Sequence, residues 1–335
     1  MNASTMRAVI CDDWCAFEDL QLGTAPVPEL RPGGVRIAIR YAGVSFATTL
    51  VVAGKYQRRP PLPFVPGTEI TGEVIECAPG VTRCKPGDSV LAPIDWGGYA
   101  EQVVASEHNV HKLPDGLPLD AAVALCISYP TSYGGLMWRG GLKAGETLLV
   151  HGAAGGVGLA AVEIGLAAGA RVIAVASSEE KRAILEARGV DAAIGPDGFR
   201  EQVEDLTDGA GLDMVYDPVG GAVTRPSLSC LRVGGRLVTI GFAGGDIPSV
   251  PLNLLLIKNI SVMGFNWGEY VGWGPTDRRE TFSEPVAEMM AALTGWWQAG
   301  KIKPTVHRQF DLADFAAAMA ELRERRAIGR VVLTP

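Results

Sequence analysis

The feature that most constrains the fold is a regular alternation of apolar strand segments with helical segments between residues 146 and 241. The segments with strand character are ETLLVH, RVIAVA, AAI, LDMVYD and GRLVTIG, and helical periodicity separates them at residues 156–168, 178–188, 197–205 and 221–232. Strands that alternate with helices in this way form a parallel sheet with right-handed crossovers. This part of the chain therefore predicts an α/β fold with a doubly wound parallel sheet.

A glycine-rich loop joins the first of these strands to the first helix. Residues 152–158 read GAAGGVG, which contains the pattern A-x-G-x-x-G. The pattern places Gly155 where the backbone approaches a pyrophosphate and Gly158 where helix and strand pack closely. Because the loop opens a series of strands and helices, we interpret it as a dinucleotide site and not as a simple tight turn. The residues expected to bind the cofactor are Ala154, Gly155, Gly156, Val157 and Gly158.

The end of the second strand indicates which dinucleotide binds. An acidic residue there would bind the ribose 2′-hydroxyl of NAD, but the position is Ala176. The following SSEE sequence, residues 177–180, fits a capping box that begins at Ser177 and explains Glu180 as a helix-capping residue.

Two cations follow in the first turn of the helix, where positive charge is unfavourable by roughly 0.3–1 kcal/mol each. These are Lys181 and Arg182. A bound 2′-phosphate would make the charge favourable, so we predict NADPH as the cofactor, with Ser177 and Lys181 as ligands of the 2′-phosphate. The alternative is that both cations are solvated surface residues.

The first 125 residues are rich in short strands. VRIAIR, GEVIECA, DSVLAPI and YAEQVVAS are separated by turn sequences that contain glycine and proline, which is typical of a barrel or sandwich. The end of the chain predicts a helix at 285–299 and a last strand, GRVVLTP. A chain of 335 residues favours two domains.

Composition and charge exclude several classes of protein. Hydrophobic residues make up 47% of the chain and charged residues 20%, as in ordinary globular proteins. The net charge of −7, with no more than two adjacent Lys or Arg residues, argues against nucleic acid as a partner. We find neither a secretory signal nor a membrane span, so we expect no membrane partner and a cytoplasmic location. The six cysteines include no CxxC pair, and we expect reduced thiols.

Several segments together resemble the medium-chain dehydrogenase/reductase superfamily, in its zinc-free quinone oxidoreductase branch, which is similar to zeta-crystallin. The segments are AGVSFATTLVVAGKY, PPLPFVPGTEITGEV, KPGDSV, GGYAEQVV, LKAGETLLVHGAAGGVGLAAVEIGLAAGARVIAV, GGRLVTIGFAGG and GRVVLTP. The resemblance implies a GroES-like β-barrel catalytic domain at 1–125 and 266–335 and a Rossmann NADPH-binding domain at 126–265. It also implies a homodimer in which residues 260–263 lie at the interface.

The same resemblance indicates that the catalytic zinc ion is missing. Zinc dehydrogenases of the superfamily carry Cys and His at positions that are Ser45 and Thr68 here, and Glu69 leaves one oxygen ligand. A catalytic zinc site needs three protein ligands. We therefore predict an NADPH-dependent reductase of quinones or α,β-unsaturated carbonyl compounds, which need no metal to delocalise the incoming charge. The alternatives are a metal-independent alcohol or aldehyde oxidoreductase and a non-catalytic NADPH-binding protein with a structural or RNA-associated role.

The resemblance also suggests catalytic residues. Tyr56 matches a tyrosine of the substrate cleft and could donate a hydrogen bond or a proton, the alternative being a surface tyrosine. Ser45 stands where the family commonly has Asn, and Thr48 stands in place of Asp. Arg58 and Arg59 are interpreted as a solvated pair, with contact to an acidic substrate as the alternative.

Further cofactor contacts are implied by the resemblance alone. A tyrosine that the family often has after the third strand is missing near Gly195. The remaining residues that we expect to contact NADPH are Phe46, Thr131, Phe242, Ala243, Phe265, Trp267 and Arg326.

Overall fold

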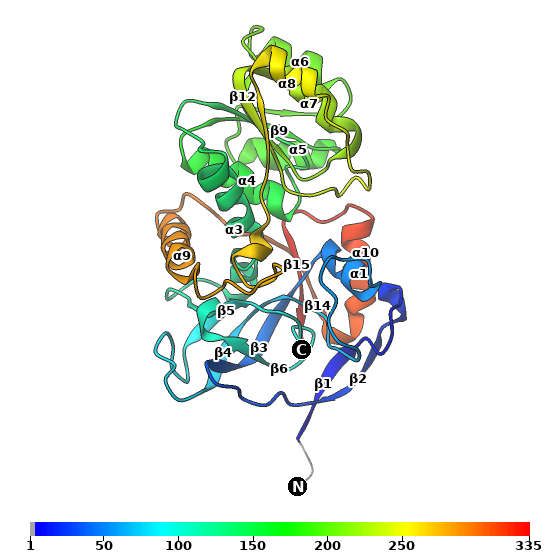
Figure 1. Ribbon diagram of the computed structural model, residues 1–335, viewed down its shortest axis with the longest axis vertical. Helices are drawn as coiled ribbons and strands as arrows, with labels where there is room; N and C mark the ends of the chain where they lie inside the picture. The colour runs from blue at the N-terminus through cyan, green and yellow to red at the C-terminus, as the bar shows by residue number, and fades with distance from the viewer. Residues whose placement is uncertain (1–3) are drawn as a thin grey trace. The chain divides into compact units, whose positions relative to one another are not determined.

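The computed structural model describes residues 4–335, which divide into two compact units (Figure 1). The barrel unit comprises the residues up to Ile127, together with Gly268–Thr294 and Pro304–Pro335. The parallel-sheet unit comprises Ser128–Trp267 and Gly295–Lys303. Each unit has its own hydrophobic core.

The parallel-sheet unit is built on six strands in the order β10-β9-β8-β11-β12-β13, and every neighbouring pair is parallel. In chain order this is 3-2-1-4-5-6, the arrangement of the doubly wound dinucleotide-binding fold. The sequence prediction of this sheet is confirmed. The strands are β8 (Thr147–Val150), β9 (Arg171–Val175), β10 (Ala192–Ile194), β11 (Leu212–Asp217), β12 (Leu231–Thr239) and β13 (Ser261–Gly264).

Helices connect these strands and pack on the sheet. Helix α4 packs on β8 and β9, α5 packs on β9 and β10, and α7 packs on β11 and β12. The helix predicted at 221–232 is shorter, because a 3-10 turn forms first and β12 already begins at Leu231. The helices are α3 (Ser128–Tyr133), continued as a π-helix over Gly134–Arg139, α4 (Gly156–Ala167), α5 (Glu179–Ala187), α6 (Phe199–Leu206), α7 (Thr224–Cys230) and α8 (Leu252–Lys258).

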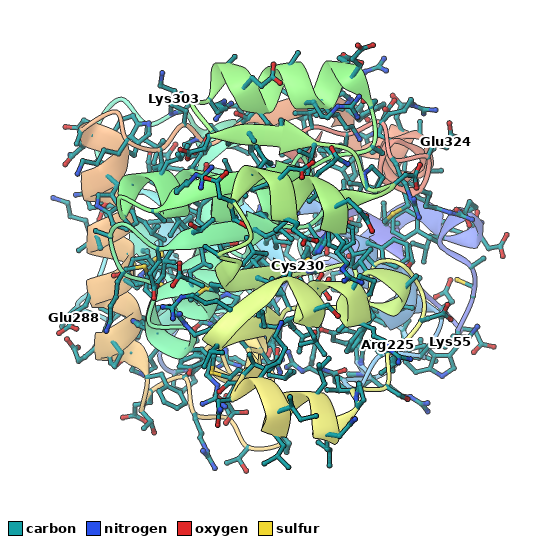
Figure 2. The ribbon with its side chains drawn as sticks, turned by 90° about the horizontal axis from the view of Figure 1, so that it is seen from above. Lys55, Arg225, Cys230, Glu288, Lys303 and Glu324 are labelled. Atoms are coloured by element: carbon teal, nitrogen blue, oxygen red, sulfur yellow. The ribbon has the colours of Figure 1, made fainter. Side chains whose placement is uncertain are left out.

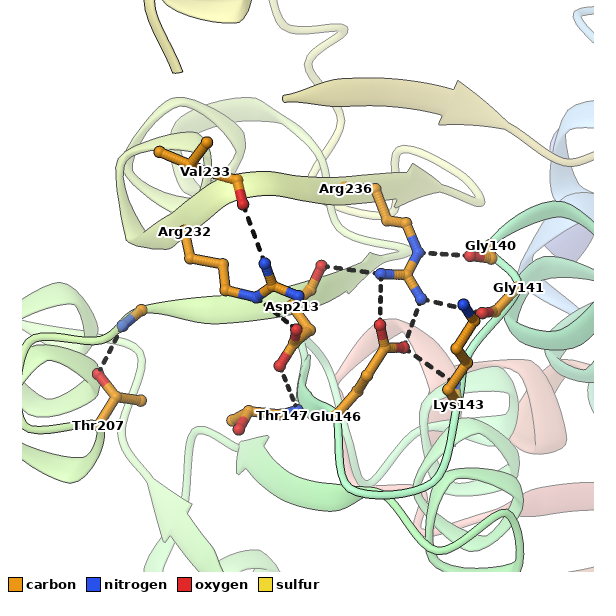
Figure 3. A network of polar contacts seen from close by, with 11 residues as sticks. Gly140, Gly141, Lys143, Glu146, Thr147, Thr207, Asp213, Arg232, Val233 and Arg236 are labelled. Atoms are coloured by element: carbon orange, nitrogen blue, oxygen red, sulfur yellow. Dashed lines mark hydrogen bonds and ion pairs between the residues drawn. The ribbon is translucent and has the colours of Figure 1, made fainter. Parts of the chain in front are cut away.

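A network of charged side chains holds the amino ends of the parallel strands (Figure 3). Arg236 of β12 donates to both carboxylate oxygens of Glu146 and to the carbonyl oxygens of Gly140, Gly141 and Asp213. Asp213 in turn accepts from the Thr147 amide at 2.8 Å. The guanidinium of Arg236 therefore ties β12 to the segment that precedes β8.

The short segment Gly295–Lys303 is fastened to this unit through a buried carboxylate. Glu163 of α4 accepts the Lys303 amide at 2.7 Å and the Tyr129 hydroxyl at 2.5 Å, and it forms an ion pair with Arg188. Arg188, at the end of α5, also donates to the carbonyl oxygen of Lys303 at 3.2 Å. Figure 2 marks the position of Lys303. The sequence pattern had not indicated these contacts.

The barrel unit is centred on the long strand β3 (Gly34–Val44). Its residues Val35, Ile37 and Ile39 are buried at a spacing of two, as expected for a strand with one face in the core. Strand β3 pairs with β4, β6 and β15 in an antiparallel sense. The strands are β1 (Thr5–Ile10), β2 (Gln21–Pro26), β4 (Glu69–Cys77), β5 (Ser89–Pro93), β6 (Gln102–Ser106), β7 (His111–Lys112), β14 (Val306–Asp311) and β15 (Arg330–Thr334).

The helices of the barrel unit are short except for α9, which has 16 residues. The sheet has the order β14-β15-β3-β4-β5-β7, while β1 and β2 form a separate pair. The helices are α1 (Phe46–Val52), α2 (Leu119–Ala122), α9 (Ser283–Gln298), which ends in the Gly295–Lys303 segment, and α10 (Phe315–Arg323). In the part of the chain that the structure describes, none of the helices is both long enough and apolar enough to span a membrane.

Candidate functional site

The glycine loop lies at the carboxyl end of β8 and leads directly into α4. Gly152 adopts a positive φ of 57°, and the amide of Ala153 donates to the carbonyl oxygen of Val175 in β9 at 3.0 Å. Helix α4 begins after Gly155, which has no side chain to cap the first helical amides. An uncapped helix N-terminus presents N–H donors and a partial positive charge, which together favour a bound anion such as pyrophosphate.

Two glycines of this loop are required for different reasons. A Cβ atom added to Gly158 would overlap the carbonyl group of Gly152, so packing inside the protein excludes a side chain there. A Cβ atom added to Gly155 would lie at an ordinary contact distance of 3.4 Å from the Gly152 oxygen, and its φ of −77° suits any residue. Nothing in the chain itself therefore requires glycine at 155, which is exposed and leaves room for a ligand.

The segment after β9 differs in one respect from the sequence prediction. Ser178, and not Ser177, is the N-cap of α5, and its hydroxyl accepts from the Lys181 amide at 3.3 Å. The predicted capping box is thus wrong by one residue, because α5 begins at Glu179 and places Lys181, instead of Glu180, at its third position. Ser177 is exposed and has no part in this cap.

The contact that Arg182 makes was not predicted from the sequence. Its guanidinium donates to the carbonyl oxygen of Ala176 at 3.1 Å, so it folds back over the end of β9. A Cβ atom added to Gly195 would lie 3.9 Å from the same guanidinium. Arg182 is thus a half-exposed cation held beside the position where the family tyrosine is missing.

The other predicted cofactor residues of this unit differ in how far they are buried. Thr131 lies inside α3 and is buried, so it does not cap the helix. Phe265 is buried with its ring against Gly134, and Trp267 is also buried. Phe242 and Ala243 follow β12 on an exposed loop, where the Ala243 amide donates to the Pro218 carbonyl oxygen at 3.1 Å.

A cavity of about 670 Å³, including its open mouth, lies in the barrel unit. Both predicted catalytic residues line it. Tyr56 is half-buried, and burial raises the pKa of its hydroxyl, so the phenol stays protonated at neutral pH. The hydroxyl of Ser45 caps α1 by accepting the Ala47 amide at 3.3 Å and keeps its proton for donation.

Most of the cavity wall is apolar, with several flat side chains. The lining residues that carry no charge or hydroxyl group are Ala47, Val51, Pro60, Phe64, Pro66, Gly67, Trp96, Ile127 and Trp273. Thr48 and Thr68 add hydroxyl groups, and Arg58 and Asp95 add charges. Such a cavity suits a largely apolar molecule with a few oxygen atoms.

Arg58 also lines this cavity, so its interpretation as one of a solvated pair is wrong. Its Nη2 donates to Asp95 at 2.8 Å, and its guanidinium lies 5.0 Å from the centre of the Trp96 ring. Its neighbour Arg59 is exposed. The two arginines therefore differ in environment, which adjacent sequence positions could not reveal.

The residues at the position of the family zinc site do not fit a zinc ion. Glu69 is fully buried and forms an ion pair with Arg330, whose positive charge takes the place next to the carboxylate. Ser45 and Thr68 supply hydroxyl groups, which are not zinc ligands of the usual type. Among residues 4–335, no group of three His, Cys, Asp or Glu side chains is placed to hold a metal ion.

Two predicted cofactor residues belong to the barrel unit. Phe46 is the first residue of α1, and 47% of its surface is exposed. The guanidinium of Arg326 donates to Glu321 at 2.9 Å and also pairs with Glu324. A phosphate bound by Arg326 would therefore have to compete with two carboxylates.

Comparison with known proteins agrees with this architecture. Residues 31–115 match the family described as alcohol dehydrogenase GroES-like domain, and residues 156–292 match zinc-binding dehydrogenase. The chain is 37% identical to quinone oxidoreductase-like protein 2 homolog of Nematostella vectensis, over 98% of this chain and 88% of the relative.

Solved structures of quinone oxidoreductases are similar over their whole length. The enzyme of Pseudomonas syringae is 30% identical with a TM-score of 0.88, and the match covers 98% of this chain and all of that one. The enzyme of Thermus thermophilus, solved alone and in complex with NADPH, is 30% identical with a TM-score of 0.82 and the same coverage.

The GroES-like and Rossmann-type domains and these matches define an oxidoreductase that uses a nicotinamide dinucleotide. The chain belongs to the medium-chain dehydrogenase/reductase superfamily, in its quinone oxidoreductase branch.

Proposed function

We propose that the protein is a zinc-independent, NADPH-dependent reductase of quinones or α,β-unsaturated carbonyl compounds. The observation that carries the proposal is the cavity of the barrel unit, where Tyr56 and Ser45 lie among walls that are mostly apolar and aromatic. A conjugated acceptor has the matching chemistry, namely a flat apolar body and a carbonyl oxygen that accepts hydrogen bonds.

The proposed cofactor is NADPH, bound by residues of the predicted domain 126–265. Its pyrophosphate would lie on the backbone of Gly155, Gly156 and Val157, at the uncapped end of α4. Its 2′-phosphate would be bound by Ser177 and Lys181. Support comes from the absence of an acid at Ala176 and from the Thermus relative that was solved with NADPH. When bound, NADPH supplies a hydride, and the acceptor takes up that hydride and one proton as NADP⁺ is formed.

In this proposal the two hydroxyl groups bind the carbonyl oxygen that gains negative charge. Because burial raises the pKa of Tyr56, its phenol is a neutral donor and can supply the proton. Ser45 donates a second hydrogen bond. Both groups would stabilise the developing charge inside a cavity with mostly apolar walls.

We propose zinc independence because the groups at the position of the family zinc site are not suitable zinc ligands. Glu69 is bound to Arg330, and Ser45 and Thr68 replace the sulfur and nitrogen ligands. Oxidation of a simple alcohol would lack the Lewis acid that stabilises an alkoxide. This favours a conjugated acceptor over an alcohol or aldehyde substrate, and the hydroxyl-bearing cavity favours an enzyme over a non-catalytic binding protein.

The experiment is steady-state oxidation of NADPH with a panel of quinones, enones and enoyl thioesters, and with alcohols in the presence of NADP⁺. We expect turnover of conjugated acceptors that is unaffected by chelators. Turnover of alcohols alone, or of nothing although NADPH binds, would contradict the proposal. A Tyr56→Phe variant with the turnover of the wild type would contradict the role of the phenol.

We further propose a homodimer that forms at the β13 edge of the parallel sheet. Strand β13 is the last strand on that side, and the exposed fractions of three apolar side chains of neighbouring α8 are large, at 77% for Leu252, 78% for Leu256 and 73% for Ile257. Exposed apolar side chains that form one contiguous patch mark an interaction surface. Light scattering after size exclusion should give a dimer, and a monomer for the wild-type chain would contradict this proposal.

A further inference from the structure

We infer that Cys77 and Cys84 form a reversible disulfide bond in reaction with a hydroperoxide, which makes this pair an oxidation site of the barrel unit. The sequence predicts reduced thiols and does not distinguish one cysteine from another. The inference is independent of the proposed function, because neither cysteine is among the residues that line the cavity with Tyr56 and Ser45.

The first observation is the distance between the two sulfur atoms. Sγ of Cys77 lies 3.9 Å from Sγ of Cys84. Cys77 is the last residue of β4, and Cys84 lies in the loop that leads to β5. Because a disulfide bond is about 2.05 Å long, the two sulfur atoms must approach by about 2 Å. Rotation about χ1, which moves only the sulfur atom of a cysteine, supplies part of this movement.

The second observation is that the loop around Cys84 borders open space. Gly80 and Gly87 adopt positive φ values of 91° and 88°, and no atom lies within 4 Å of the position of a Cβ on either residue. One of these glycines precedes Cys84 and the other follows it. A small shift of the loop that brings the sulfur atoms together therefore meets no packed neighbour at these two turns.

The two thiols differ in exposure, which decides the order in which they react. Cys77 is half-buried, whereas only 9% of Cys84 is exposed. Burial, together with the neighbouring Cys77, raises the pKa of the Cys84 thiol to about 12. A peroxide reacts with a thiolate that it can reach. Cys77 therefore reacts first, and Cys84 is the thiol that resolves the product.

The reaction consists of two balanced steps. The thiolate of Cys77 attacks an oxygen of the hydroperoxide ROOH, so that an S–O bond forms, the O–O bond breaks and ROH leaves after protonation. Cys84 then loses its proton, and its sulfur attacks the sulfenic acid at Cys77. The S–S bond forms, the S–O bond breaks and the oxygen leaves as water. The two thiols lose two electrons in total, and the hydroperoxide gains them.

Cys11 and Cys15 are a second candidate pair, and they are held more firmly. Cys11 is fully buried, and its sulfur donates to the carbonyl oxygen of Asp13 at 3.2 Å. The backbone of Cys11 is also paired with Phe64 in both directions, at 2.9 and 3.1 Å. We therefore expect a bond between Cys11 and Cys15 to form more slowly than the bond between Cys77 and Cys84.

The disulfide bond would fasten the loop that carries Arg83. The guanidinium of Arg83 donates to Glu284 at 3.0 Å and to Ser283 at 3.3 Å, at the start of α9. A bond that closes a loop restricts mainly the unfolded chain. Oxidation should therefore raise the melting temperature, by about 2–4 °C.

The experiment treats the full chain with hydrogen peroxide, blocks the remaining thiols with iodoacetamide and maps the peptides by mass spectrometry. Trypsin cleaves after Arg83, so the disulfide bond would join the peptides of residues 59–83 and 84–112. We expect this linked pair to form at least about fivefold faster than a bond between Cys11 and Cys15. Dithiothreitol should abolish the link and reverse the rise in melting temperature.

Two variants test the order of the steps. In Cys84→Ser, dimedone should trap a sulfenic acid at Cys77, because no thiol is left to resolve it. In Cys77→Ser, no sulfenic acid should form at Cys84 at the same peroxide concentration. Cys15→Ser is the matched control, since Cys15 is the other half-buried cysteine, and it should leave the link between Cys77 and Cys84 unchanged.

A wild-type chain in which residues 59–83 and 84–112 stay unlinked would overturn the inference. So would a bond that joins Cys11 to Cys15 first, or one that joins two chains instead. A melting temperature that rises when dithiothreitol is added would show that the bond does not fit the folded loop, which also overturns the inference. The peptide map of the wild type decides the question even if Cys84→Ser does not fold.

Discussion

The two ends of the parallel sheet differ in whether their hydrogen-bond donors have acceptors within the protein. At the amino end, the guanidinium of Arg236 has protein acceptors for all three nitrogens (Figure 3). At the carboxyl end, helix α4 begins at a glycine, with no side chain to accept its first amides. The amino end therefore has little capacity left for a ligand, whereas the carboxyl end has N–H donors available.

This difference separates residues that stabilise the fold from residues that bind. In open parallel sheets, ligands bind outside the carboxyl ends of the strands. The network of Arg236 and Glu146 joins strands, so its loss should affect unfolding. Gly155 and Lys181 lie beyond strand ends, and changes there should affect the cofactor. Substitutions at the amino end should therefore change stability, and substitutions at the carboxyl end should change cofactor binding.

Substitution of Arg236 by Met should destabilise the parallel-sheet unit strongly. It leaves the carboxylate of Glu146 without its cation although only 16% of that side chain is exposed. Removal of one partner from a buried ion pair typically costs about 3–5 kcal/mol. Urea unfolding followed by circular dichroism should give a loss near the lower value, about 3 kcal/mol.

The control for this variant lies within the same network. Arg232 pairs with Asp213 through a side chain that is 48% exposed. Arg232→Met should cost less than Arg236→Met because Arg232 makes two hydrogen bonds and Arg236 makes five. If both variants unfold at the same urea concentration, the network does not stabilise the fold as described.

The two loop glycines should respond differently to alanine. Gly158→Ala introduces a methyl group into the space of the Gly152 carbonyl and should cost about 2–3 kcal/mol of stability. Gly155→Ala meets no close contact and should leave the stability within about 0.5 kcal/mol of the wild type. Its affinity for NADPH, measured by calorimetry, should nevertheless fall about tenfold or more. Unchanged affinity would show that nothing approaches the backbone at Gly155.

Substitution of Lys181 by Ala should change cofactor preference more than stability. Loss of one charged hydrogen bond to the 2′-phosphate should raise the KM for NADPH about tenfold, and the KM for NADH should change little. Lys143→Ala is the matched control, since Lys143 is exposed near the amino ends of the strands. Equal effects of Lys181→Ala on both cofactors would remove Lys181 from the 2′-phosphate site.

Local sequence patterns predicted the strands of the parallel sheet correctly. They did not predict the roles of several side chains. The strands at 192–194 and 212–217 have the predicted bounds, because their apolar runs end at turns that the sequence displays. The capping residue was wrong, since Ser177 and Ser178 have equal propensity and the true start of α5 depends on its packing. Boundaries of this kind are decided by tertiary contacts.

Local sequence patterns were also insufficient to predict the candidate site. Tyr56 and Ser45 were identified from a family resemblance, and the structure brings both to one cavity. Arg58 was misinterpreted because the sequence does not distinguish a solvated arginine from a partly buried one. The environment of Arg58 depends on Asp95 and Trp96, which lie far along the chain. Trp273 lies farther still, so no local pattern could have joined it to Arg58.

The smallest predicted effect is a pH dependence of the amino-end network. Burial alone would raise the pKa of Glu146, and Asp213 acts in the same direction. Hydrogen bonds from Arg236 and the Lys143 amide outweigh both and lower the pKa below its usual value. The group then binds fewer protons in the folded state, so its contribution to stability is present above pH about 4.3 and is lost as the pH falls through the folded pKa.

The difference in unfolding free energy between the wild type and Glu146→Gln isolates this contribution, because other carboxyl groups titrate equally in both proteins. The difference should be constant between pH 7 and 5 and should shrink as the pH falls from 5 to 3, where protonated Glu146 resembles glutamine. The change should be smaller than the effect of Arg236→Met. A difference that grows on acidification would mean that the pKa of Glu146 is raised, and that the carboxylate is not stabilised by Arg236.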